Sequence, residues 1–162
     1  MTTMKSKNSI IDLVNDVEVL LREWETDAVI SEYELDKASV DSGSLHAKYL
    51  ELYTLARLNL KKAEAKYSEL RKVKWIYYMG KMTKEEMDRR GWSYDPFDGA
   101  TKPLKSDLEM FITEDSELKN LEMITEYKKT IFECLSEILN TIRWRHTNIK
   151  NAIEFKKFTA GM

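Results

Sequence analysis

Two long stretches of the sequence place apolar residues at alternating intervals of three and four, over residues 45–77 and 121–152. In each stretch, eight of the ten positions in this seam are apolar. Such spacing is typical of long amphipathic helices that pack against other helices. The chain has only 5 Gly and 2 Pro, and both prolines, Pro96 and Pro103, fall between the stretches. We therefore expect an all-α fold, an elongated helical hairpin or bundle with two long helices.

Local start and stop signals suggest where these helices begin and end. A first amphipathic helix is expected over about residues 10–28, and the run Asp41-Ser42-Gly43-Ser44 is expected to be a turn that caps the next helix. Gly80 is expected to end that helix, and Thr83 to open a short one. The predicted segments are an acidic N-terminal helical region (1–41), a long basic helical arm (42–90), a loop and short helix (91–114), and a C-terminal oligomerisation helix (115–162).

The last helix carries an apolar face that must be covered, either by the earlier helix folding back or by other subunits. Isoleucine at both kinds of seam position favours assemblies of more than two helices. The predicted oligomerisation residues are Leu121, Ile124, Ile131, Leu135, Ile138, Ile142 and Ile149. Arg145 interrupts this seam. In an oligomer it would pair with a carboxylate across the interface or line an open pore, and its seam position favours pairing.

The net charge of −2 conceals alternating charged blocks. Residues 57–81 carry eight Lys or Arg and two acidic residues, a net charge of +6, and residues 128–162 have a net charge of +4. Residues 1–56 and 82–127 are each at −6. One charged block is as often a solvated helix face as a binding surface. Two basic blocks separated by an acidic one favour an anionic partner.

The first basic block ends in a mixture of cations and aromatic rings, Lys72-Val73-Lys74-Trp75-Ile76-Tyr77-Tyr78-Met79-Gly80-Lys81. Phosphates bind Lys and Arg, and unpaired bases stack on flat rings, so this mixture is typical of sites for single-stranded nucleic acid. The residues predicted to bind it are Arg71, Lys72, Lys74, Tyr77, Tyr78 and Lys81. In the alternative interpretation, Trp75 and the two tyrosines are core or interface aromatics and the lysines are ordinary surface residues.

Little in the sequence supports catalysis or a cofactor. The two histidines, His46 and His146, lie far apart, and no CxxC motif, Gly-rich phosphate loop or Glu-x-x-His pair occurs. The single Cys134 has apolar neighbours and is expected to be a buried thiol. No apolar run approaches the roughly 20 residues that span a bilayer. We therefore expect a cytosolic, non-enzymatic protein without a metal or cofactor.

Two parts of the sequence resemble the UvsY-type recombination mediators of T4-like tailed bacteriophages. The first part, Lys72-x-Lys74-x-x-Tyr77-Tyr78-x-Gly80-Lys81, is similar to the family's basic, double-tyrosine, glycine motif. The second is a looser series that begins at Leu104-x-x-Asp107-Leu108 and ends at Phe158-Thr159-Ala160-Gly161. Together they cover about half of the chain in the family's order.

This resemblance implies an accessory protein that binds single-stranded DNA. It would help a RecA-like recombinase to replace the phage single-strand-binding protein on that DNA, in the cytoplasm of the infected bacterial host. It also implies a ring-like homo-oligomer held by the C-terminal helix. By position, the family's DNA-contacting basic pair falls on Lys72 and Lys74, with Lys74 standing where the family has arginine. The roles of the acidic N-terminal region and of residues 82–103, the subunit number and the recombinase-binding surface stay open.

The alternative function is that of a helical scaffold or assembly protein that binds no nucleic acid. Such a protein would use the same apolar seams. Salt-sensitive binding to an oligonucleotide distinguishes the two functions, because contacts to phosphates release counterions and weaken as salt rises.

Overall fold

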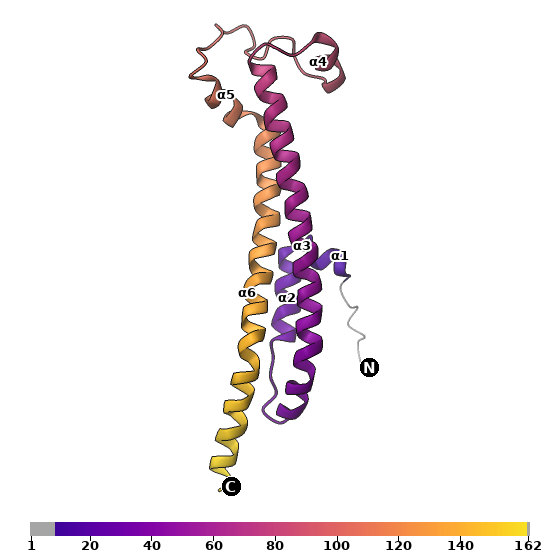
Figure 1. Ribbon diagram of the computed structural model, residues 1–162, viewed down its shortest axis with the longest axis vertical. Helices are drawn as coiled ribbons and strands as arrows, with labels where there is room; N and C mark the ends of the chain where they lie inside the picture. Colours follow the sequence, from indigo (N-terminus) through magenta and orange to yellow (C-terminus); the bar gives the residue numbers. More distant parts are fainter. Residues whose placement is uncertain (1–8, 162) are drawn as a thin grey trace. The chain divides into compact units, whose positions relative to one another are not determined.

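The computed structural model describes residues 9–161, and every regular element in that range is a helix, which confirms the all-α fold class. Helices α3 and α6 are each 44 residues long, and in the sequence they flank the segment that contains both prolines. Within the described range, no helix is long and apolar enough to cross a membrane. The helices are α1 (Ile10–Leu13), α2 (Val17–Asp27), α3 (Leu35–Tyr78), α4 (Lys84–Arg90), α5 (Leu108–Glu114) and α6 (Ser116–Thr159) (Figure 1).

The first helix expected from the sequence is in fact two helices. Ser9 and Asp12 form a capping box that opens α1, which ends after a single turn. Asp16 then opens α2, where its carboxylate accepts hydrogen bonds from the N–H groups of Glu18 and Val19. The break is set by these caps, which satisfy N–H groups that have no partner inside a helix.

The turn expected at residues 41–44 is wrong, because α3 begins at Leu35 and continues through this run. The Ser42 hydroxyl donates to the carbonyl of Ala38 at 2.8 Å, and the Ser44 hydroxyl donates to the carbonyl of Asp41 at 2.9 Å. Both serines bond back to the preceding turn of the same helix, a pattern that helices tolerate. They therefore do not cap a new helix.

The expected end of α3 is confirmed. Gly80 has a φ of 69°, a left-handed conformation that glycine adopts without steric cost. Its N–H donates to the Tyr77 carbonyl at 2.9 Å, and the Lys81 N–H donates to the Ile76 carbonyl at 3.1 Å. These two bonds form a Schellman motif.

The expected start of a short helix at Thr83 is also confirmed. The Thr83 hydroxyl accepts a hydrogen bond from the Glu86 N–H and opens α4. The Asp115 carboxylate accepts bonds from the N–H groups of Glu117 and Leu118, at 3.0 and 3.1 Å, and opens α6. α6 therefore begins at Ser116, one residue from the expected start of the C-terminal helix at residue 115.

The chain divides into two compact units, each of which combines several helices. Unit 1 comprises Met1–Leu60 and Lys128–Met162, and unit 2 comprises Lys61–Tyr127. Since α3 and α6 contribute to both units, segments far apart in the sequence build each core.

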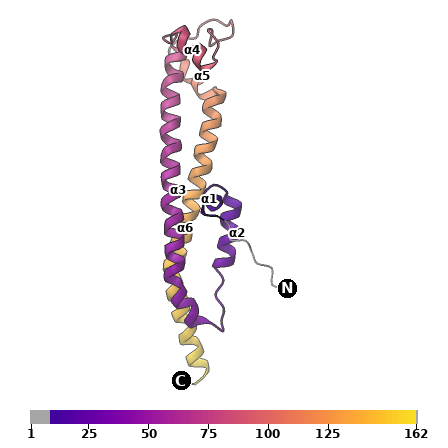
Figure 2. The same cartoon turned by 90° about the vertical axis from the view of Figure 1, so that its right-hand side faces the viewer.

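In unit 1, α2 lies alongside the parts of α3 and α6 that belong to this unit (Figures 1 and 2). The Trp24 ring packs edge-on against the Tyr49 ring, with centroids 5.3 Å apart. Within unit 1, the apolar face of α6 is thus covered by earlier helices of the same chain, one of the two alternatives that the sequence left open. The buried core consists of Leu13, Val14, Leu20, Tyr49, Leu52, Ala56, Ile131, Leu135, Ile138, Leu139 and Ile142. Cys134 is half-buried against it.

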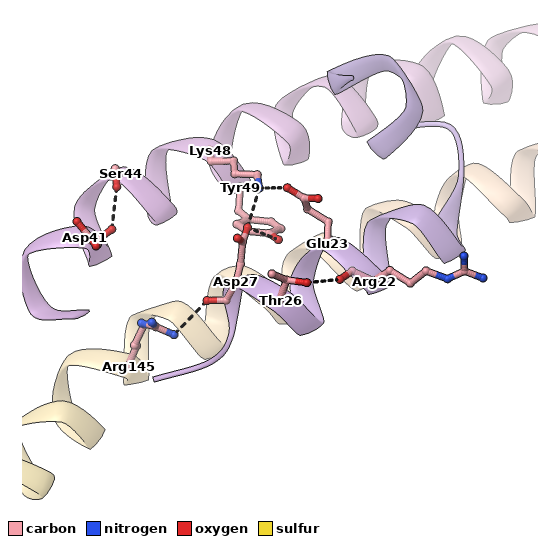
Figure 3. Close-up of polar contacts among 9 residues, drawn as sticks. All are labelled: Arg22, Glu23, Thr26, Asp27, Asp41, Ser44, Lys48, Tyr49 and Arg145. Carbon is pink, nitrogen blue, oxygen red and sulfur yellow. Dashed lines mark hydrogen bonds and ion pairs between the residues drawn. The ribbon is translucent and has the colours of Figure 1, made fainter. Parts of the chain in front are cut away.

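Arg145 is buried inside unit 1, where it donates to the end of α2. Its guanidinium lies 2.9 Å from the Ala28 carbonyl oxygen and 3.2 Å from that of Val29. Figure 3 shows its longer contact, at 3.5 Å, with the Asp27 carbonyl oxygen. A cation is favourable there, because the carbonyls at a helix C-terminus lack partners and carry partial negative charge. The expectation of a carboxylate across an interface, or of a pore, is therefore wrong for this residue, which caps a helix of its own chain.

Unit 2 has a separate core that is rich in aromatic rings. Trp92, Phe97 and Phe111 pack around it from the segment after α4 and from α5. The two tyrosines at the end of α3 therefore lie in an apolar setting. The buried members of this core are Tyr77, Tyr78, Met87, Leu108, Ile112 and Leu118.

Candidate nucleic-acid interface

The six residues predicted to bind nucleic acid all lie in unit 2, at or just after the end of α3, but they divide into a buried and an exposed group. Lys74, Tyr77 and Tyr78 are only 4%, 6% and 8% exposed. Arg71, Lys72 and Lys81 are exposed. Because successive helical residues point in different directions, neighbours in the sequence can have opposite environments.

Lys74 is held by two carboxylates and an aromatic face. Its ammonium nitrogen lies 2.9 Å from Oδ2 of Asp115 and 2.7 Å from Oε2 of Glu117. It also lies 3.8 Å from the centroid of the Trp92 ring, a cation–π distance. These contacts compensate the cost of burying an ammonium group. The charge of Lys74 is therefore paired inside the unit, and its predicted contact with DNA stays a prediction.

The two tyrosines join the end of α3 to the surrounding segments. The Tyr77 hydroxyl donates to the Ser93 carbonyl, and the Tyr78 hydroxyl donates to Asp115, both at 2.9 Å. Protein rings lie against both tyrosines, with the Trp92 centroid 4.9 Å from Tyr77 and the Phe97 centroid 5.9 Å from Tyr78. Neither ring is thus open to a base, and the predicted role of the tyrosines in DNA contact stays a prediction.

Asp115 connects these groups. Burial on its own would raise the pKa of this carboxyl, but hydrogen bonds from Lys74, the Leu118 N–H and Tyr78 outweigh burial and hold the pKa below its usual range. In Tyr78, burial and the bond to Asp115 raise the pKa of the hydroxyl, which stays protonated. We call Lys74, Tyr77, Tyr78, Trp92, Asp115 and Glu117 the Lys74 cluster; it fixes the end of α3 to the start of α6 inside unit 2.

An exposed surface of different character lies on another side of α3. Arg71, Lys72 and Trp75 line a shallow hollow of about 260 Å³ together with Ser68, Glu109 and Ile112. The Trp75 side chain is 46% exposed. The Arg71 guanidinium forms an ion pair with Glu109 of α5, and within residues 9–161 no partner is found for the Lys72 ammonium. We call Arg71, Lys72, Trp75 and Glu109 the Trp75 surface.

Trp75 is absent from the residues predicted to bind nucleic acid, although a signal for it exists in the sequence. Residues three and four positions apart on a helix are neighbours on its surface, so Trp75 shares a face with Lys72 and Arg71. The same rule does not reveal Glu109, which comes from another helix.

The predicted oligomerisation residues also divide. Ile131, Leu135, Ile138 and Ile142 belong to the core of unit 1, and Ile149 is likewise buried, at 2% exposure. In unit 2, Leu121 is half-buried and Ile124 is 52% exposed. These two side chains line a surface hollow of about 410 Å³, with Leu70 and Trp92 among its other walls. Of the seven predicted oligomerisation residues, which all lie within residues 9–161, only Leu121 and Ile124 are accessible to another molecule.

Comparison with known proteins identifies similar chains. The model of one family, described as "Recombination, repair and ssDNA binding protein UvsY", matches residues 23–162. Crystal structures of the bacteriophage T4 recombination mediator protein UvsY are similar in fold. The lattice type II structure has a TM-score of 0.76 at 21% identity, over 89% of this chain and 97% of that chain. The lattice type IV structure has a TM-score of 0.74 at 19% identity, over 88% and 98%. No curated protein matches significantly.

Proposed function

Because the chain belongs to the UvsY family of recombination, repair and single-stranded-DNA-binding proteins, we propose that it binds single-stranded DNA as a recombination mediator. In this role it helps a RecA-like recombinase to replace a phage single-strand-binding protein on DNA. It does so without catalysis, in the cytoplasm of an infected bacterium. The family match supports this proposal over residues 23–162, a range that includes the whole Trp75 surface.

The observation that carries DNA binding is the Trp75 surface, where two cations and an exposed indole lie together. Arg71 and Lys72 supply positive charge for phosphates, and Lys81 adds a further exposed cation just beyond α3. Phosphate contacts provide most of the affinity of sequence-independent binding. We assign phosphate contact to Arg71, Lys72 and Lys81.

Lys74 has a different role in this proposal. Its ion pairs with Asp115 and Glu117 hold the end of α3 in place. Arg71 and Lys72 lie within one helical turn of it. Lys74 is therefore a positioning residue, and its loss weakens DNA binding only by loosening the surface beside it.

The test is a fluorescence-anisotropy titration of labelled oligothymidylate at several salt concentrations with the Lys72→Ala variant. We expect weaker binding and a plot of log affinity against log salt that is less steep by about 0.7, the value for one lost phosphate contact on a single strand. The matched control is Lys37→Ala, which removes the same charge from an exposed position of α3 outside the basic block. This control should bind like the unchanged protein.

Two results would contradict these assignments. If the unchanged protein does not bind oligothymidylate at low salt, the DNA-binding function is wrong and the scaffold function is favoured. If Lys72→Ala and Lys37→Ala have the same salt slope, the DNA-binding function stands but Lys72 does not contact a phosphate.

We further propose that the protein acts as a ring-like homo-oligomer. Several weak DNA sites on one assembly gain affinity from each other, because the second contact is intramolecular once the first has formed. Leu121 and Ile124 are the predicted oligomerisation residues that remain accessible. We therefore place a subunit contact at their hollow on unit 2.

A further inference from the structure

We propose that Trp75 is a stacking platform for one unpaired base of the bound single strand, held between phosphates that contact Arg71 and Lys72. This inference rests on the proposed DNA-binding function. It assigns a base contact to a surface for which charge alone predicts only phosphate contacts.

The first argument is the exposure of a large apolar ring. Trp75 is 46% exposed, whereas Tyr77 and Tyr78 are 6% and 8% exposed and lie against other rings of the unit. At the end of α3, the indole is thus the aromatic group that a base can reach. Stacking on it would be tolerant of sequence, because every base has a π face.

The second argument is the size and form of the hollow beside the indole. Its volume of about 260 Å³ lies below the range of about 300–1,000 Å³ that is usual for pockets enclosing small molecules. Ile112 and the indole supply apolar walls, and Ser68 supplies a polar edge. A shallow hollow of this kind suits one flat ring that lies on a side chain, with the rest of the ligand outside.

The third argument is the position of the charges. Lys72 and Arg71 lie three and four residues before Trp75, which places both cations on the same helix face as the indole. A base stacked on Trp75 would have its own phosphate and a neighbouring phosphate within reach of these two side chains. Guanidinium and ammonium groups next to an aromatic ring are what single-stranded nucleic acid requires.

Glu109 opposes this binding. Its carboxylate neutralises Arg71 through an ion pair in which the two side chains are 49% and 59% exposed. Exposed pairs of this kind contribute little to stability, so a phosphate can displace the carboxylate from Arg71. Glu109 is thus a counter-charge that lowers DNA affinity.

The experiment compares Trp75→Ala with the unchanged protein on two ligands, oligothymidylate and an abasic oligonucleotide of the same length. The abasic strand keeps the phosphates and sugars but has no base to stack. We expect Trp75→Ala to bind oligothymidylate about 5- to 150-fold more weakly, the range measured for loss of one stacked base. Its affinity for the abasic strand and its salt slope should stay unchanged, and Trp75→Phe should retain most of the binding.

The control is Tyr94→Ala, which removes another exposed aromatic ring of unit 2 and should not change the preference for oligothymidylate. If Trp75→Ala keeps the full preference, or loses affinity equally for both strands, the stacking proposal is overturned. If the unchanged protein binds neither strand, the proposed function itself fails.

Glu109→Gln should raise the affinity for both strands, and an unchanged or lower affinity would overturn the role assigned to that carboxylate.

Discussion

At the scale of single residues, the Lys74 cluster shows how a buried cation can hold the end of one helix against the start of another. The ammonium group of Lys74 has two carboxylate partners and one ring partner, so little of its charge is left uncompensated. Removing one partner from a buried ion pair leaves the other charge buried and unpaired. This usually destabilises the fold more than replacing both charged residues with apolar ones.

The first prediction at this scale concerns Asp115→Asn. We expect the variant to lower the free energy of unfolding by about 1–3 kcal/mol at neutral pH, because it removes the charge that faces Lys74 and Tyr78. The folded state holds the pKa of Asp115 below its ordinary value of 3.8, so this contribution is complete above that value and disappears as the pH falls through the lower, folded-state pKa. Urea unfolding of both proteins, followed by circular dichroism at pH 7 and at successively lower pH, measures the difference in their free energy of unfolding. A difference between variant and unchanged protein that stays constant down to pH 2 would contradict the prediction.

The sequence predicts the location of this site better than the role of each residue in it. The block of cations and rings at residues 71–81 contains three of the four residues of the Trp75 surface, and Glu109 comes from α5. Its periodicity cannot show that Tyr78 bonds to a residue 37 positions away, or that Lys74 has carboxylate partners on α6. A lysine that neutralises a buried acid and a lysine that binds a phosphate have the same sequence signal, and only the fold separates them.

At the scale of elements, apolar periodicity and caps predict the two long helices well. Gly80, Thr83 and Asp115 act at helix ends as their residue types suggest. The run Asp41-Ser42-Gly43-Ser44 fails as a signal because its residues are weak helix formers rather than obligatory helix breakers. Packing of Leu35 and later apolar residues of α3 outweighs this local preference, which is the usual effect of tertiary contacts on propensity.

The prediction at this scale is that Arg145→Met weakens the attachment of α2. Loss of the guanidinium leaves the Ala28 and Val29 carbonyls without their donor, and we expect the free energy of unfolding to fall by about 1–3 kcal/mol. Arg143→Met is the matched control, because Arg143 lies two residues earlier on α6 and is exposed, so its loss should change stability by less than about 0.5 kcal/mol. Chemical denaturation of both variants measures the difference, and equal losses would show that the bonds to α2 contribute nothing.

At the scale of the whole molecule, the same apolar pattern is compatible with two purposes, a core within one chain and a contact between subunits, which the sequence cannot separate. A seam residue buried against its own chain and a seam residue buried against another subunit have the same chemistry and the same spacing. Within α6, four of the predicted oligomerisation residues complete the core of unit 1, whereas Ile124 stays accessible on unit 2. The exposed fraction of each seam residue in the folded chain therefore distinguishes residues of the chain's own core from residues that another subunit can reach, which the spacing alone does not.

The last prediction uses this distinction by placing the same new charge at two positions of α6. Ile138 is 4% exposed, so Ile138→Glu buries a carboxylate and should lower the free energy of unfolding by more than about 3 kcal/mol. Ile124 is 52% exposed, so Ile124→Glu should leave helix content and stability nearly unchanged while it lowers the assembly mass measured by light scattering. Leu104→Glu, at another exposed apolar position of unit 2, should change neither quantity. If Ile124→Glu keeps the full mass, the subunit contact lies elsewhere.

Since phosphate contact is assigned to other residues of unit 2, a smaller assembly should still bind the strand, but more weakly because it presents fewer sites at once.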